Sequence, residues 1–371
     1  MKAYWHSLSI ILGILLLTSC EGLARREPKE NFRMRSSNPL VLIDNEKGLR
    51  EHFWDTYSNR LAIVIPFTMH DSDKVRKRIS SWSEIGPACK YSFQSNHTKL
   101  IDIIFWFHLD LQANPELVEQ LNMLVSSELA FMRHCFANVK FLSAHLRSDE
   151  DTYPGGVSIM WYKLFLENVS GFTGHYDYMF WMEHDVQPIR PLWIDKLYLE
   201  ISTPEFFIKG SVFRGRYLDK YFNDRRLIPQ IPHINGNALF RVGSEEFNHL
   251  IRAARLQYPP EKDWNPMDTS LFLTLMNFSS RWSQFQSYIH KIVYSDFIQN
   301  WSVDYTENIG QNIYEKDATT FFIHGDGHSA ADRVSPRTTL KARRHPSLKV
   351  SRPPKHQVAR FAKSRFLLNT R

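Results

Sequence analysis

Apolar residues gather in short runs over the middle of this 371-residue chain. Such runs, with their β-branched and aromatic content, are typical of strands buried on both faces of a sheet. The pattern predicts four strands in the first half of the body: Leu61–Phe67, Leu100–Phe107, Asn138–Ser143 and Tyr178–Met182.

Stretches with apolar residues at helical spacing separate these strands. A basic helix is expected over 74–82, a second opens at Asn114–Glu116, and a third covers 157–165. The second begins with an Asn cap followed by a Pro, which is favoured in the first helical turn. Alternating strands and helices predict an α/β fold with a mainly parallel sheet flanked by helices.

The pattern loosens after Trp193. A turn at 233–237 enters a strand that reaches Phe240, and Ser244 is placed to cap a helix. We also expect strands over Phe206–Phe213 and Thr320–His324, and a helix after Asn265.

The two ends of the chain differ from the body. Residues 1–22 have the length of a signal peptide or short signal anchor, although Leu17–Cys20 also fits a bacterial lipoprotein box. Residues 23–57 are a predicted stem, 58–332 a single catalytic domain, and 333–371 a basic tail. Four Asn-x-Ser/Thr triplets accompany the leader, so we expect the secretory pathway (the Golgi or endoplasmic reticulum lumen), with membrane anchoring through the N-terminus as one option.

The net charge of +7 does not indicate a nucleic-acid-binding protein. The tail holds 12 of the 46 Lys and Arg residues and no acidic residue, so the rest has 34 basic against 39 acidic residues, a net of −5. A mildly acidic body lacks the basic surface that nucleic acid requires.

Three cysteines exclude a disulfide-dense scaffold and a four-cysteine zinc site. Cys20 lies in the predicted leader. Cys89 and Cys135 remain, either as one disulfide or as two buried free thiols.

The strongest candidates for functional residues are two carboxylates that follow the fourth strand. Glu183 and Asp185 are spaced i, i+2, and Pro188 and Pro191 then end any strand pairing. Side chains two apart on an extended chain point the same way, and the carboxyl edge of an α/β sheet is where ligands bind. Hard oxygen ligands there predict a Mg²⁺ or Mn²⁺ site that holds a diphosphate.

His324 is a further candidate ligand, because a neutral imidazole at a strand end beside glycine can approach a metal. The alternative is a histidine in a surface loop. A divalent ion would stabilise the charge that grows on a diphosphate leaving group during sugar transfer.

The segment Tyr178–Asp185 resembles the Asp-x-Asp motif of GT-A-type glycosyltransferases, with Glu in the first place. The order of motifs is also similar: an early Ile-Val-Ile-Pro-Phe strand, an Asn-Gly-Asn turn and a late His-Gly. The similarity covers about Leu61 to His328. It implies a GT-A-like (Rossmann-like) catalytic domain, a nucleoside-diphosphate-sugar donor, and a glycan or glycoprotein acceptor.

The resemblance also implies roles for individual residues. Pro66, Phe67 and Asp71 would line the nucleotide pocket, and Trp161 would face either the donor or the core. The turn of Asn235, Gly236 and Asn237 would lie near a sugar. Asp268 is the candidate general base if the enzyme inverts configuration, although an Asp before an apolar helix is also an ordinary N-cap.

Two other functions fit parts of the pattern. A metal-dependent phosphoesterase could use His and carboxylate ligands from the 183–185 segment, His233 and 325–328 in a two-metal site. A catalytically silent carbohydrate-binding relative would keep the aromatic residues and lack turnover.

Overall fold

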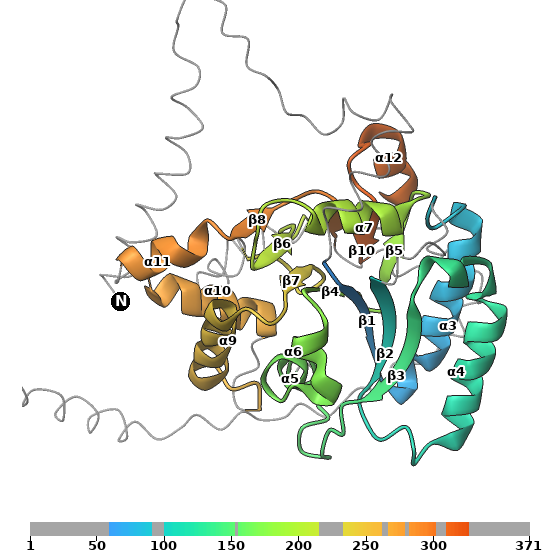
Figure 1. The fold of residues 1–371 in the computed structure, drawn as a ribbon, viewed down its shortest axis with the longest axis horizontal. Helices are drawn as coiled ribbons and strands as arrows, with labels where there is room; N and C mark the ends of the chain where they lie inside the picture. Colours follow the sequence, from blue (N-terminus) through green and yellow to red (C-terminus); the bar gives the residue numbers. More distant parts are fainter. Residues whose placement is uncertain are drawn as a thin grey trace, which may run out of the picture. The chain divides into compact units, whose positions relative to one another are not determined.

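Four parallel strands form the first half of the central β-sheet (Figure 1). The computed structural model describes residues 59–90, 100–152, 155–214, 233–261, 266–278, 282–301 and 309–325. The four strands lie in the order β3-β2-β1-β4. They are β1 (Leu61–Phe67), β2 (Ile101–Phe107), β3 (Asn138–Ser143) and β4 (Tyr178–Trp181). All four lie where the apolar runs predict them.

Three short strands extend this sheet beyond β4. Strand β7 (Leu239–Arg241) pairs antiparallel with β4 and with β6 (Ile208–Gly210), and β6 pairs parallel with β8 (Ile292–Tyr294). Four of the six pairings are therefore parallel. The predicted α/β class, with a mainly parallel sheet flanked by helices, is confirmed.

Helices cover both faces of the sheet, with α3 and α4 on one side and α5 and α9 on the other (Figure 1). The first face packs α3 (Ser72–Ser81), α4 (Pro115–Ser127) and α7 (Trp193–Ile201). The second packs α5 (Gly155–Leu166), α6 (Phe172–His175), α9 (Glu245–Gln257), α10 (Met267–Asn277) and α11 (Trp282–Ile289). In β1, Ile63 faces the first layer and Val64 the second. Burial on both faces explains why this run is apolar throughout.

A second sheet of three short strands stands at the carboxyl end of β4. Strand β10 (Phe322–His324) lies between β5 (Val186–Pro188) and β9 (Ile298–Asn300), antiparallel to β5 and parallel to β9. Strand β5 had no prediction, but it ends at Pro188, where the prolines were expected to end strand pairing. Pro188 ends an edge strand, where its missing N–H breaks no ladder.

Some of the helix starts predicted from capping residues are confirmed by the structure, and others are not. The Ser244 side chain accepts the Phe247 N–H at 3.3 Å, as a predicted N-cap does. Pro115 opens α4 as predicted, but the Asn114 side chain donates to the Asp110 carbonyl instead of capping. Helices α7, α11 and α12 (Ile309–Lys316) had no prediction, and the strand expected over Phe206–Phe213 is confined to β6.

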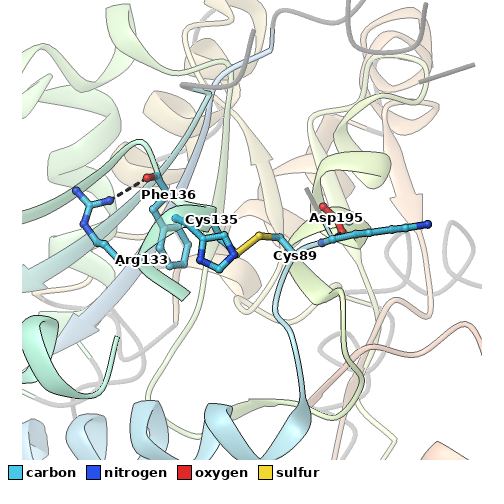
Figure 2. The surroundings of a disulfide bond; sticks show 7 residues. Cys89, Arg133, Cys135, Phe136 and Asp195 are labelled. Atoms are coloured by element: carbon cyan, nitrogen blue, oxygen red, sulfur yellow. Dashed lines mark hydrogen bonds between the residues drawn. A yellow bond between two sulfur atoms is a disulfide. The ribbon is translucent and has the colours of Figure 1, made fainter. Parts of the chain in front are cut away.

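Cys89 and Cys135 form a disulfide, with Cα atoms 5.9 Å apart (Figure 2). The bond joins the segment after α3 to the segment before β3 across 46 residues. Next to it, the Asp195 carboxylate of α7 accepts the Lys90 N–H at 2.7 Å. Of the two alternatives for these cysteines, the bridge is the one formed.

The predicted leader, stem and basic tail lie outside the described residues, so their boundaries stay predictions. Within the described ranges, no helix is both long and apolar enough to cross a membrane.

Candidate metal and sugar-nucleotide site

Two carboxylates and one imidazole converge where the two sheets meet. Glu183 and Asp185 follow β4, and His324 ends β10. The His324 Nε2 atom lies 3.2 Å from Asp185 Oδ2 and 3.8 Å from Glu183 Oε2. One ligand atom from each of the three residues lies within 4.8 Å of the others. The structure thus brings together the three predicted metal ligands from segments about 140 residues apart in the sequence.

The two carboxylates converge through a turn and not through an extended strand. Residues 184–185 form a turn, and the Val186 N–H donates to the Glu183 carbonyl at 2.9 Å. Arg78 of α3 holds this turn from outside, since it donates to the His184 carbonyl at 3.1 Å and to Gln187 Oε1 at 2.6 Å. Glu183 and Asp185 do point to one site, as predicted, but the prediction of an extended strand between them is wrong.

The charges of the three groups are mutually dependent. Burial, helped by the negative charge of Asp185, raises the pKa of Glu183. Burial also acts to raise the pKa of Asp185, but the charge and hydrogen bond of His324 outweigh it and hold that pKa well below its usual range. Burial acts to lower the pKa of His324, yet the facing Asp185 carboxylate raises it to about 9. Without a metal, a proton on His324 supplies the positive charge that the carboxylates require.

Asn300 fixes which nitrogen of His324 faces the carboxylates. Its Nδ2 donates to the Ser211 carbonyl at 2.8 Å and to Ser211 Oγ at 2.9 Å, so its Oδ1 is the atom that faces His324 Nδ1 at 3.1 Å. An oxygen acceptor there requires a proton on Nδ1. Nε2 is therefore the nitrogen available to a metal, an arrangement typical of metal-binding histidines.

Asn237 holds Glu183 in place through two hydrogen bonds. Its Nδ2 donates to Glu183 Oε2 at 3.1 Å, and its Oδ1 accepts the Glu183 N–H at 2.9 Å. Asn237 is 1% exposed. The predicted sugar-binding residue is thus a support of the acidic segment.

The chemistry of this cluster fits a divalent cation. Asp185 Oδ1 is buried and accepts no hydrogen bond from any described residue. A buried carboxylate oxygen without a partner is costly unless a ligand completes it. Two carboxylates and one imidazole are side chains that bind divalent cations in proteins.

Asp268 lies beside this cluster and is tightly held. Its Oδ2 accepts the Gly236 N–H at 2.7 Å, its Oδ1 accepts the Thr269 N–H at 2.6 Å, and His233 Nε2 is 3.5 Å from Oδ2. Burial acts to raise the pKa of Asp268, but His233 and the two backbone donors lower it. The N-cap of α10 is Pro266, so the alternative of Asp268 as an N-cap is wrong.

A side chain at Gly236 would require the end of the Met267 side chain to move, because a Cβ there would meet Met267 Cε at 2.7 Å. Gly236 donates its N–H to Asp268 Oδ2, and its neighbour Asn237 contacts Glu183.

Two predicted substrate contacts lie in the core. Phe67 is 2% exposed and packs against Phe105 and Phe107. Trp161 is 0% exposed and packs against Phe165 and Phe240. Apolar packing surrounds both rings, so Phe67 does not line the candidate pocket, and of the two alternatives for Trp161 the core is correct.

Asp71 and Pro66 keep positions near the predicted pocket. Pro66 is a buried residue of β1, one position before its end. Asp71 Oδ1 is 3.9 Å from His184 Nε2, which places it next to the acidic turn. The Thr68 hydroxyl and Lys74 also donate to its carboxylate.

The ligands of a two-metal site do not assemble among the described residues. The only groups of three potential ligands there are the 183–185 carboxylates with His324, and Cys89, His134 and Cys135. The second group contains the disulfide, so its sulfur atoms are not thiolate ligands.

No family model matches this sequence, and no curated protein matches it. Solved structures do match. Mouse xyloside xylosyltransferase 1 is 11% identical, with a TM-score of 0.43 over 72% of this chain and 97% of that one. The galactosyltransferase LgtC, solved with donor and acceptor sugar analogues, is 13% identical, with a TM-score of 0.38 over 71% of this chain and 86% of that one.

The bifunctional glycosyltransferase WbbM also matches, at 11% identity and a TM-score of 0.40. The match covers 74% of this chain and 47% of WbbM. All three are glycosyltransferases. With TM-scores below 0.5, these similarities assign no function to this chain.

Proposed function

We propose that this protein is a metal-assisted glycosyltransferase that uses a nucleoside-diphosphate sugar and a glycan or glycoprotein acceptor. The observation that carries the proposal is the convergence of Glu183, Asp185 and His324 at the carboxyl edge of an α/β sheet. That edge is where such folds bind nucleotides. The similarity of 178–185 to the Asp-x-Asp motif supports the same donor class.

In this proposal the chain's own groups hold a cation and the donor. Asp185 and His324 Nε2 would be direct ligands of a divalent cation such as Mn²⁺, and Glu183 would bind it directly or through water. The bound ion would neutralise charge on the departing diphosphate. Asn237 and Asn300 keep Glu183 and His324 in place, so the site is ordered before the donor arrives.

Asp268 is proposed to contact a sugar hydroxyl at the far side of the Asn235–Asn237 turn. A carboxylate with a lowered pKa accepts hydrogen bonds well but removes protons poorly. Its role as general base in an inverting reaction stays a prediction. An Asp268→Asn enzyme that keeps its fold separates the two roles, because loss of a base lowers kcat while loss of a sugar contact raises KM.

We place this activity in the lumen of the secretory pathway. The predicted leader, the disulfide and the Asn-x-Ser/Thr triplets support that location. Anchoring of the N-terminus in the membrane is part of the same proposal and concerns residues outside the described ranges.

The phosphoesterase alternative needs a second metal, and its predicted ligands at 326–328 lie outside the described residues. Turnover separates the transferase from a silent carbohydrate-binding relative. We expect purified protein to hydrolyse one member of a panel of nucleoside-diphosphate sugars slowly with Mn²⁺, and to lose that activity in EDTA. Release of phosphate from simple esters, or glycan binding without any donor cleavage, would contradict the proposal.

A further inference from the structure

Three of the four Asn-x-Ser/Thr triplets begin within the described residues, and their surroundings differ. They begin at Asn168, Asn277 and Asn300, while the Asn96 triplet lies outside the described ranges. An N-linked glycan is attached through the side-chain Nδ2 atom. The environment of that nitrogen therefore decides whether the folded chain can carry the glycan.

Two of these asparagines use Nδ2 inside the fold. Asn300 is 0% exposed, and its Nδ2 donates both protons to Ser211. A sugar there would break the support of His324. Asn277 is half-buried, and its Nδ2 donates to the Tyr258 hydroxyl at 3.0 Å. A glycan on Asn300 would displace a contact with Ser211, whereas one on Asn277 would have to leave the hydrogen bond to Tyr258 in place.

Asn168 has the opposite arrangement. It is exposed on the turn between α5 and α6, with a left-handed backbone (φ 48°) that asparagine tolerates. Its Oδ1 accepts the Thr173 N–H at 2.8 Å, and its backbone carbonyl accepts the Gly171 N–H at 3.0 Å. Both acceptors thus hold the turn, while Nδ2 donates to no described residue. Ser170, the hydroxyl residue of this triplet, is also exposed.

We propose that Asn168 is an N-glycosylation site. The amide Nδ2 forms a bond to the anomeric carbon of a lipid-pyrophosphate-linked oligosaccharide, the bond from that carbon to the pyrophosphate breaks, and the amide loses one proton. The lipid pyrophosphate leaves. The Cys89–Cys135 disulfide supports the oxidising compartment in which this donor occurs.

The position of Asn168 keeps a glycan away from the proposed active site. The 168–175 segment leads into β4, whereas Glu183 and Asp185 follow its carboxyl end. Figure 1 shows α6 and β10 on opposite sides of β4. A glycan on Asn168 therefore leaves donor and acceptor access open.

The test is a glycan map of the full chain secreted from a eukaryotic host. Peptide N-glycosidase converts a glycosylated Asn to Asp, and digestion in heavy-oxygen water marks the converted residue for mass spectrometry. We expect the mark at Asn168 and none at Asn300 in folded protein. Ser170→Ala should remove the mark at Asn168 completely, whereas Ser279→Ala, the matched change in the Asn277 triplet, should leave it unchanged.

A folded protein with an unmodified Asn168, or with a glycan on Asn300, would overturn the proposal. The result does not depend on the transferase proposal, because occupancy is measured on the peptide. Donor hydrolysis by the Ser170→Ala protein serves as the separate readout, and it should equal that of the wild type.

Discussion

At the residue scale, Asn300 is the support on which His324 depends. Its Oδ1 faces His324 Nδ1 and leaves Nε2 toward Asp185. We predict that Asn300→Ala weakens Mn²⁺ binding about 10- to 100-fold, the usual effect of losing such a partner. Isothermal titration with Mn²⁺ measures this.

Gln299→Ala is the matched control for that measurement. Gln299 is buried on the same strand and hydrogen-bonds Asp317 and Thr320, so its loss costs similar stability without contact to His324. Equal Mn²⁺ affinity in the two variants would contradict a specific role for Asn300.

Asp195 makes stability depend on pH. Burial raises its pKa to about 6, although the Lys90 N–H acts to lower it, and its Oδ1 has no hydrogen-bond partner among the described residues. The folded protein therefore binds this proton more tightly than the unfolded chain, and stability contributed by the protonated form is lost as pH rises from about 4 to 6.

We predict that Asp195→Asn stabilises the protein by up to about 3 kcal/mol above pH 6 and changes little near pH 4. Urea unfolding at both pH values measures the difference. A variant that is equally stabilising at both values would show that ionisation of Asp195 is not the cause.

The candidate metal ligands could be predicted from the sequence, but the residues that hydrogen-bond to them could not. Glu183, Asp185 and His324 follow apolar strands, so local pattern located them. Arg78 and Asn300 had no such signal, because their contacts join segments far apart in the chain; Arg78 and His184 are 106 residues apart. Trp161 was placed in the pocket or the core, and only packing could decide.

At the element scale, Arg190 ties the small sheet to α12. Its guanidinium donates to the carbonyls of Thr320, Tyr314 and Asp317, and it stacks 4.4 Å from the Tyr314 ring centroid. These carbonyls lie at the end of α12 and in the connection to β10, which ends in His324. The arginine thereby fixes the element that supplies the imidazole.

We predict that Arg190→Ala lowers the local stability of 309–325 by about 3 kcal/mol, since hydrogen bonds to a charged group are lost. Hydrogen exchange should rise in these peptides, and Mn²⁺ affinity should fall with it. Arg255→Ala, which removes an ion pair with Glu261 on another part of the fold, is the control. Unchanged exchange over 309–325 would exclude this role of Arg190.

The long apolar runs allowed the parallel strands to be predicted nearly to the residue. Strands β5, β8 and β9 have three residues each, too few for a periodic pattern, and they exist because neighbouring strands pair with them. Helix α7 had no prediction, although its buried residues Ile194, Leu197 and Ile201 have helical spacing.

At the scale of the whole molecule, the disulfide joins the segment after α3 to the segment before β3 within one layer of the core. Closing a loop across 46 residues stabilises the fold by about 4 kcal/mol in the chain-entropy model. We predict that Cys135→Ser lowers the urea midpoint, as a reducing agent does for the wild type, while Mn²⁺ binding in the folded state persists. A reductant that leaves the midpoint unchanged would contradict a stabilising bridge.

Glu183, Asp185 and His324 are proposed to form a single divalent-metal site. Its most direct test is the loss of the free Mn²⁺ paramagnetic resonance signal as metal-free protein is added. We predict one tightly bound Mn²⁺ per chain, tighter binding with a nucleoside diphosphate present, and loss of this binding in folded Asp185→Asn. Binding that is absent from the wild type, or unchanged in Asp185→Asn, would contradict the account.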